Sequence, residues 1–275
     1  MVSRFGSRLR AAMDERGPLC VGIDPHPSLL AAWGLSDDPS GLESFASTCV
    51  EALAARVAVL KPQSAFFERH GAAGIAVLER TVAAARSQGC LVLLDAKRGD
   101  IGSTMQAYAD AYLRPSSALA VDALTVTPYL GFGSLQPVID TALASGGGVF
   151  VVTLTSNPEG ASVQGARTGA RSVSGDILAA VGTLNAGKHP LGSVGAVVAA
   201  NLAEVTDDLA INGPLLAPGL GAQGGTAEGL RRIFAGVLDQ VLPSTSREVL
   251  GAGPDVRRLQ TAADRSVEAV AAALR

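Results

Sequence analysis

Three charged residues stand close together where an apolar run ends, at Asp95, Lys97 and Asp100. An apolar run without a polar face predicts a strand that is buried on both sides, and side chains two residues apart on a strand share a face. Asp95 and Lys97 are therefore expected side by side, roughly 7 Å apart along the backbone. Such a pair can supply a proton and electrostatic stabilisation to a reaction, or it can be a structural ion pair followed by a helix N-cap at Asp100.

Two further charged residues end other apolar runs of the chain. Asp24 ends the first run and Lys61 ends the second. If the runs are parallel strands of one barrel, these side chains point into a shared mouth. Two lysines and up to three aspartates nearly balance their charge there, which makes their burial tolerable. The alternatives are a turn-forming aspartate before Pro25 and a lysine that reaches solvent from the edge of a sheet.

A candidate phosphate site lies near the C-terminus, where a glycine-rich stretch at residues 218–225 and the stretch 244–247 follow two further apolar runs. A glycine-rich loop exposes backbone N–H groups, and an arginine can bind a phosphate through two hydrogen bonds. Arg247 is the candidate cation, although Arg231 and Arg232 lie nearby in sequence and a surface role is its alternative. Glycine-rich stretches after strands can also form mobile lids, and residues 156–165 are a second one.

The elements that must position these residues follow a regular alternation of strands and helices. Segments between the apolar runs, such as 41–55, 74–88 and 255–274, show the apolar spacing of helices. Eight units in one chain of 275 residues predict a single (β/α)8 barrel domain over residues 1–275. A doubly wound open sheet is the alternative, but no glycine-rich dinucleotide motif follows the first run. The predicted strands are residues 19–24, 57–61, 91–97, 123–128, 148–155, 194–200, 214–220 and 241–246.

Composition narrows the class of protein. Hydrophobic residues make up 48% and charged residues 17% of the chain, which indicates a large packed interior. The net charge of −3 argues against a nucleic-acid-binding surface. With no apolar run long enough for a signal peptide or a membrane span, we expect a cytoplasmic protein without a membrane partner. Cys20, Cys49 and Cys90 lack the spacing of metal ligands and are expected as reduced core residues.

The stretch from Asp95 to Ile101, with Thr104 behind it, resembles the Asp-x-Lys-x-x-Asp signature of orotidine 5′-phosphate decarboxylases. The run 218–225 resembles the phosphate loop of the same family, and matching residues occur in order from Asp24 to Arg247. The resemblance implies a barrel that converts orotidine 5′-monophosphate to uridine 5′-monophosphate in pyrimidine biosynthesis, with no cofactor and no metal. This chain departs from many compact members at Ala96, Arg98 and Ser103.

The resemblance also implies roles for single residues. Lys61, Asp95, Lys97 and Asp100 match the family's catalytic array, with Lys97 as the proton donor. In the family, the fourth member of the array and the threonine behind it come from the neighbouring subunit, which predicts a homodimer with shared active sites. Contacts to the nucleotide substrate are then assigned to Asp24 and Lys61 at the ribose, Ser156 at the base, Gln223 and Arg247 at the phosphate, and Thr104 from the partner.

Two other functions remain open at this point. Relatives in the same superfamily use a similar motif to bind a metal and a sugar phosphate, as lyases or aldolases. Lys61 argues against this reading, because a cation facing Asp95 competes with a metal for the same charge, and those relatives place a glutamate there. A barrel that binds a phosphate-bearing ligand without turnover is the other candidate, but it leaves the Asp95, Lys97 and Asp100 array unexplained.

Overall fold

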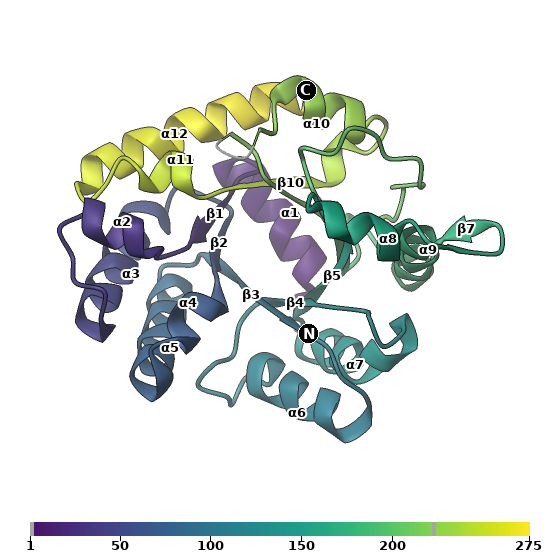
Figure 1. Ribbon diagram of the computed structural model, residues 1–275, viewed down its shortest axis with the longest axis horizontal. Coiled ribbons are helices and arrows are strands. Elements are labelled where there is room, and N and C mark those ends of the chain that lie inside the picture. The colour runs from purple at the N-terminus through teal and green to yellow at the C-terminus, as the bar shows by residue number, and fades with distance from the viewer. Residues whose placement is uncertain (1–2, 222–223) are drawn as a thin grey trace.

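The computed structural model describes residues 3–221 and 224–275. Eight parallel strands close into a barrel in the order β1-β10-β9-β8-β5-β4-β3-β2, and helices surround them (Figure 1). This confirms the predicted (β/α)8 barrel, because each predicted apolar run overlaps one barrel strand. The barrel strands are β1 Cys20–Ile23, β2 Val59–Pro62, β3 Leu91–Arg98, β4 Ala123–Val126, β5 Gly148–Leu154, β8 Val194–Val198, β9 Leu215–Pro218 and β10 Val241–Thr245.

Side chains accept hydrogen bonds from free N–H groups at the start of some of the helices. Asp38 accepts hydrogen bonds from the backbone N–H groups of Ser40 and Gly41 at 2.9 Å each, so α3 begins at Pro39, two residues before the predicted start. The α-helices are α1 Phe5–Arg16, α2 Pro27–Ala32, α3 Pro39–Leu53, α4 Ser64–Glu68, α5 Gly71–Ser87, α6 Gly102–Leu113, α7 Gln136–Ser145, α8 Ala161–Gln164, α9 Val173–Asn185, α10 Ala227–Ile233, α11 Arg247–Leu250 and α12 Val256–Ala273. Short 3-10 helices are η1 Phe132–Leu135, η2 Pro158–Gly160 and η3 Leu238–Gln240, and β6 Arg167–Thr168 pairs with β7 Arg171–Ser172 as an antiparallel hairpin.

The alternation of side chains on β3 separates two apolar cores. Leu91 and Leu93 belong to the cluster inside the barrel, whereas Val92 and Leu94 pack in the layer between the strands and the helices. The next inward position is Asp95, at the carboxyl end of the strand. Because alternate residues of a strand share a face, Asp95 follows the interior leucines on the inward side of β3 and lies at the barrel mouth.

Helix α1 closes the opposite end of the barrel. Phe5, Leu9 and Met13 belong to the interior cluster, and α1 lies behind the strands in Figure 1. Arg8 fixes the helix from its other side, because its Nη1 donates to Oδ1 of the buried Asp122 at 2.6 Å. Sequence periodicity does not reveal this role, since a helix pattern does not say against which surface the helix packs.

The three cysteines lie in the protein interior. Cys20, Cys49 and Cys90 are buried and unpaired, and burial raises the pKa of Cys20 to about 12. Thiols in such surroundings are poor nucleophiles. None of the helices in the described part of the chain combines the length and apolar character that a membrane span requires.

We predict that Leu9→Ala lowers the free energy of unfolding by about 2–5 kcal/mol, because it opens a cavity under the barrel at a fully buried position. Leu143→Ala on α7 is the matched control, because that leucine is 47% exposed, and its effect should stay within about 0.5 kcal/mol. Urea unfolding followed by circular dichroism measures both. Equal losses in the two variants would show that α1 does not seal the barrel.

Candidate active site

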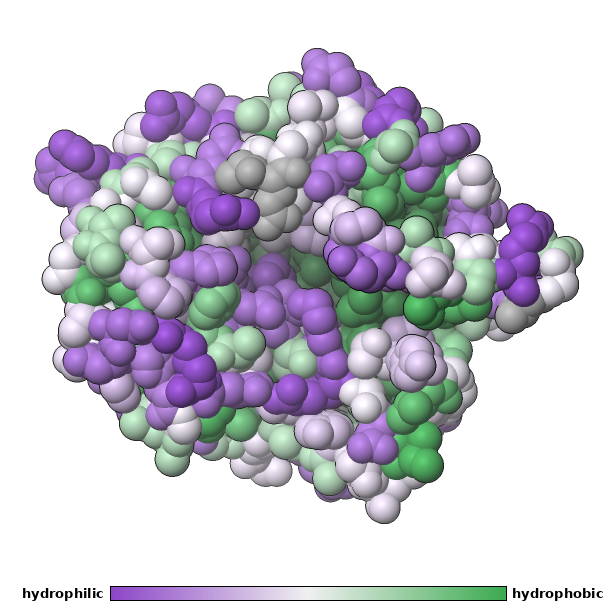
Figure 2. Space-filling view, viewed as in Figure 1, coloured by the Kyte–Doolittle hydropathy of each residue, from purple (hydrophilic) through white to green (hydrophobic). Residues whose placement is uncertain are grey.

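The carboxyl ends of β2, β3 and β4 bring four polar side chains into contact at the barrel mouth. Lys61 Nζ donates to Asp95 Oδ2 at 3.1 Å, and Lys97 Nζ donates to Asp95 Oδ1 at 2.6 Å. The Thr125 hydroxyl on β4 donates to the same Oδ1 at 2.8 Å. Figure 2 looks onto this face and shows hydrophilic side chains gathered around a hollow near its centre. Asp95 is thus held through both of its oxygens.

Burial and charge act against each other on the central pair. Asp95 is 8% and Lys61 6% exposed. Burial alone raises the pKa of Asp95, but Lys61, Lys97 and the hydrogen bonds from Lys97 and Thr125 hold that pKa well below its ordinary value. Burial likewise lowers the pKa of Lys61, and the carboxylates of Asp95 and Asp24 reverse this and raise it. Both groups therefore stay charged at neutral pH.

A bulge in β3 sets the backbone conformation at Lys97, the second lysine of the array. The pairing register with β4 shifts between Leu94 and Arg98, and Lys97 has a φ of +47°. A left-handed backbone costs a non-glycine residue about 1–2 kcal/mol. The Lys97 N–H compensates in part by donating to Thr125 Oγ1 at 3.0 Å. The predicted proximity of Asp95 and Lys97 is confirmed, and so is the strand as far as Lys97, although a bulge interrupts its regular pairing with β4.

Two cavities meet at this array. One, of about 180 Å³, has Asp24, Lys61 and Asp95 on one side and the β9 and β10 ends with Arg247 on the other. The second, of about 130 Å³, runs from Lys61, Asp95 and Lys97 toward the residues after β5, including Ser156. Lys61, Asp95 and Pro218 line both. The structure thus gathers six predicted residues around one connected space, namely Asp24, Lys61, Asp95, Lys97, Ser156 and Arg247.

The larger of these two cavities presents unsatisfied polar atoms. Asp24 Oδ1, Thr245 Oγ1 and Ser246 Oγ are buried and have no hydrogen-bond partner among residues 3–221 and 224–275. Native proteins rarely leave buried polar atoms unpaired, so such a group indicates a place where a polar ligand or water binds. A ligand with hydroxyl and anionic oxygens would suit a carboxylate, two hydroxyls and Arg247 together.

Two predicted residues do not join the array in the described part of the chain. Asp100 Oδ1 accepts the N–H of Ile101 at 2.8 Å, and Thr104 is exposed on α6. The alternative of Asp100 as the helix N-cap is wrong, because α6 begins at Gly102 and Ile101 holds the cap position without a side-chain bond. Gln223 lies outside the described residues.

Sequence reasoning missed Thr125, which contacts both Asp95 and the backbone of Lys97. A signal was present, because Thr125 is two residues after the interior Ala123 and therefore on the inward face of β4. Thr245 and Ser246 lie in the segment assigned to phosphate binding, but neither was singled out. Within residues 3–221 and 224–275, no three His, Cys, Asp or Glu side chains form a group that could hold a metal ion.

Known proteins resemble this chain over nearly its whole length. The sequence model of the family described as orotidine 5′-phosphate decarboxylase / HUMPS matches residues 17–262. An orotidine 5′-phosphate decarboxylase of Salinispora arenicola is 64% identical over 98% of both chains, and one of Streptomyces coelicolor is 63% identical over 95% of both chains. The crystal structure of a Streptomyces avermitilis protein, provisionally assigned to the same enzyme, has a TM-score of 0.97 and 61% identity, covering 99% of this chain and 96% of that one.

We predict that Asp95→Asn lowers the free energy of unfolding at pH 7 by about 3–5 kcal/mol, because the buried Lys61 loses its counter-charge. The pKa of an aspartate in the unfolded chain is about 3.9. In the folded protein the pKa of Asp95 lies below this value. The contribution of the carboxylate is therefore present above that pH and is lost as the pH falls through the folded value. Urea unfolding from pH 5 to pH 8 should show a constant difference between the two proteins.

The double variant Lys61→Met, Asp95→Asn is the control, because it removes both charges together. It should recover most of the lost stability. The single variant Lys61→Met completes the comparison. If the loss of unfolding free energy in the double variant equals the sum of the losses in the two single variants, the two charges are not coupled and the ion pair does not stabilise the site.

Proposed function

The chain belongs to the orotidine 5′-phosphate decarboxylase / HUMPS family, and from this premise we propose that it converts orotidine 5′-monophosphate to uridine 5′-monophosphate and carbon dioxide. This is the decarboxylation step of de novo pyrimidine biosynthesis, and we propose that it proceeds here in the cytoplasm without a cofactor or metal. The observation that carries the proposal is a carboxylate with a lysine on each of its oxygens, at the junction of two cavities.

The occupied oxygens of Asp95 favour this reaction over a metal-dependent lyase. Lys61 Nζ contacts Oδ2, while Lys97 Nζ and the Thr125 hydroxyl contact Oδ1. A divalent cation bound through Asp95 would have to displace an ammonium group and would then face two positive charges. Relatives named as orotidine 5′-phosphate decarboxylase at 61–64% identity support the same choice.

The array suits the chemistry of this decarboxylation. Breaking the bond between C6 and the carboxylate leaves an electron pair on C6, and that charge needs a nearby cation and then a proton. Lys97 is proposed to supply both, donating a proton from Nζ to C6 as carbon dioxide leaves. Asp95 orients Lys97 and lies beside the departing carboxylate. The hydrogen bond of 2.6 Å between Lys97 and Asp95 supports this division of roles.

The two cavities divide the substrate between them in this proposal. Asp24 and Lys61 bind the ribose hydroxyls, and Arg247 binds the phosphate together with Gln223 and the glycine-rich loop after β9. Ser156 contacts the base in the second cavity. The unpaired atoms Asp24 Oδ1 and Ser246 Oγ support the assignment of a polar ligand to the first cavity. Contacts to the phosphate would contribute binding energy far from the reacting carbon.

We predict that the purified protein consumes orotidine 5′-monophosphate at the same rate with and without excess EDTA, because lysines provide the cations of the site. The decrease in absorbance of the substrate measures the rate, and added magnesium serves as the control. If the chelator abolishes turnover and magnesium restores it, the metal-dependent lyase is the correct alternative. Stoichiometric binding of the nucleotide without any turnover would favour the non-catalytic barrel.

We further propose a homodimer in which Asp100 and Thr104 complete the partner's site. Within the described residues, neither side chain contacts the array of its own chain; Asp100 lies two residues before α6, and Thr104 lies in the first turn of that helix. Large exposed apolar side chains stand on the neighbouring loops, with Ile101 61%, Tyr129 80% and Leu130 53% exposed. These loops are adjacent, because the Thr127 N–H donates to the Arg98 carbonyl at 2.8 Å. An exposed apolar patch of this kind is typical of an interface.

A mixture of two inactive variants tests the shared site. Lys97→Ala and Asp100→Ala should each be nearly inactive, whereas a mixed dimer would pair the intact Lys97 of one chain with the intact Asp100 of the other. Equal amounts reassort into about one half mixed dimers, so refolding them together should restore roughly a quarter of wild-type activity. Verified mixed dimers that are no more active than their parents would show that each site is built within one chain.

A further inference from the structure

The side chain of Gln164, at the end of α8, is hydrogen-bonded at both ends to Thr155. Its Oε1 accepts the Thr155 backbone N–H at 2.9 Å, and its Nε2 donates to Thr155 Oγ1 at 2.7 Å. The Thr155 hydroxyl can then only donate onward, and it does so to Asn157 Oδ1 at 2.6 Å. The direction of every bond in this chain is set by the amide of Gln164.

Thr155 is the first residue beyond β5, and it forms part of the wall of the smaller cavity. β5 ends at Leu154, whose carbonyl still accepts the N–H of Ala199, the residue after β8, at 2.9 Å. The next N–H, that of Thr155, is bonded to Gln164 instead. Leu154, Thr155 and Ser156 all line this cavity. The position of the wall therefore depends on Gln164 where the barrel ladder stops.

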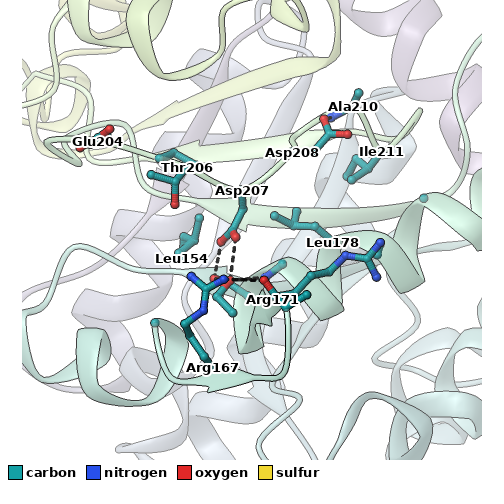
Figure 3. Close-up of a pocket in the computed structure, with 18 of the residues that line it drawn as sticks. Leu154, Arg167, Arg171, Leu178, Glu204, Thr206, Asp207, Asp208, Ala210 and Ile211 are labelled. Atoms are coloured by element: carbon teal, nitrogen blue, oxygen red, sulfur yellow. Dashed lines mark hydrogen bonds between the residues drawn. The ribbon is translucent and has the colours of Figure 1, made fainter.

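Gln164 is itself anchored from the outer side of the barrel. Asp207, on the segment between β8 and β9, accepts hydrogen bonds from Ser172 Oγ at 2.6 Å and from Ser174 Oγ at 2.5 Å, as Figure 3 shows. The same Ser174 hydroxyl lies 3.0 Å from the Gln164 carbonyl oxygen, so its one proton is shared between the Asp207 carboxylate and this carbonyl. Ser172 caps α9 by accepting the Gly175 N–H at 2.8 Å. The start of α9, Asp207 and the end of α8 thus form one bonded unit.

This unit borders a cavity of about 850 Å³, drawn in Figure 3. None of the predicted site residues that the structure describes lines it. Leu154 lines both this cavity and the smaller cavity of the array. The strand end at Leu154, from which Thr155 and Ser156 continue, therefore has open space on two sides, so packing there contributes little to holding the residues that follow. Directed hydrogen bonds from Gln164 are suited to hold it.

We propose that Gln164 is a positioning residue that holds Thr155 and Ser156 in place to contact the base of the substrate. The inference rests on the proposed function, because it assigns the base to the smaller cavity. Gln164 does not line that cavity, so it acts through Thr155. Its loss should weaken contacts to the base in the ground state and the transition state alike, and should leave the ribose and phosphate contacts on the other side of Asp95 unchanged.

The test replaces the amide with a side chain of similar length that cannot make these bonds, in Gln164→Met. We expect KM for orotidine 5′-monophosphate to rise about tenfold with kcat within about twofold of wild type, as for the loss of two ordinary hydrogen bonds. Ribose 5-phosphate, which lacks the base, should inhibit both proteins with equal inhibition constants. Gln136→Met is the matched control, because Gln136 is exposed on α7 and its amide donates to Asp140 on the same helix. The kcat and KM of this variant should equal those of wild type.

A second variant, Ser174→Ala, removes a contact to Asp207 and should raise KM in the same direction by a smaller factor. An active wild type with an unchanged KM in Gln164→Met would overturn this inference alone. A parallel rise in the inhibition constant of ribose 5-phosphate would also overturn it, because it would show general damage to the site. A wild type without turnover would overturn the proposed function, and this inference with it.

Discussion

The buried carboxylate of Asp95 is the constraint on which the site depends. A charge that is 8% exposed needs compensation, and Lys61, Lys97 and Thr125 provide it from β2, β3 and β4. Those three strands must therefore end at matching heights around the mouth. The pKa values of Asp95 and Lys61 move apart, so each group keeps the charge that stabilises the other. The array is assembled before any ligand binds, which is a condition for electrostatic preorganisation.

The barrel separates stability from chemistry along its axis. The interior leucines of β3 and the side chains of α1 fill the end that α1 closes, and polar side chains occupy the other end. The left-handed backbone at Lys97 lies at the boundary between these regions. Its neighbour Arg98 is held by Glu68 and by the Tyr112 hydroxyl. Fixed residues on both sides of Lys97 maintain a conformation that the isolated segment would not favour.

The loops beyond the strands add a further layer of support. The residues that face the second cavity after β5 are tied to α8 and α9, and the residues after β3 lead to an exposed apolar patch. The first arrangement is complete within one chain. In the proposed dimer, the second is completed by the partner. In both arrangements, elements outside the cavities hold in position the residues that would contact the substrate.

The sequence by itself determined the eight strands, the helices between them and most of the charged residues at the mouth, because the period of two and the polar end of each strand depend on neighbours along the chain. The tertiary structure decided the place of α1, the bulge at Lys97 and the role of Thr125. Asp95 and Thr125 are 30 residues apart, and Lys61 and Asp95 are 34 apart. Such contacts exist only once the barrel closes, and closure follows from the packing of all its strands and helices together.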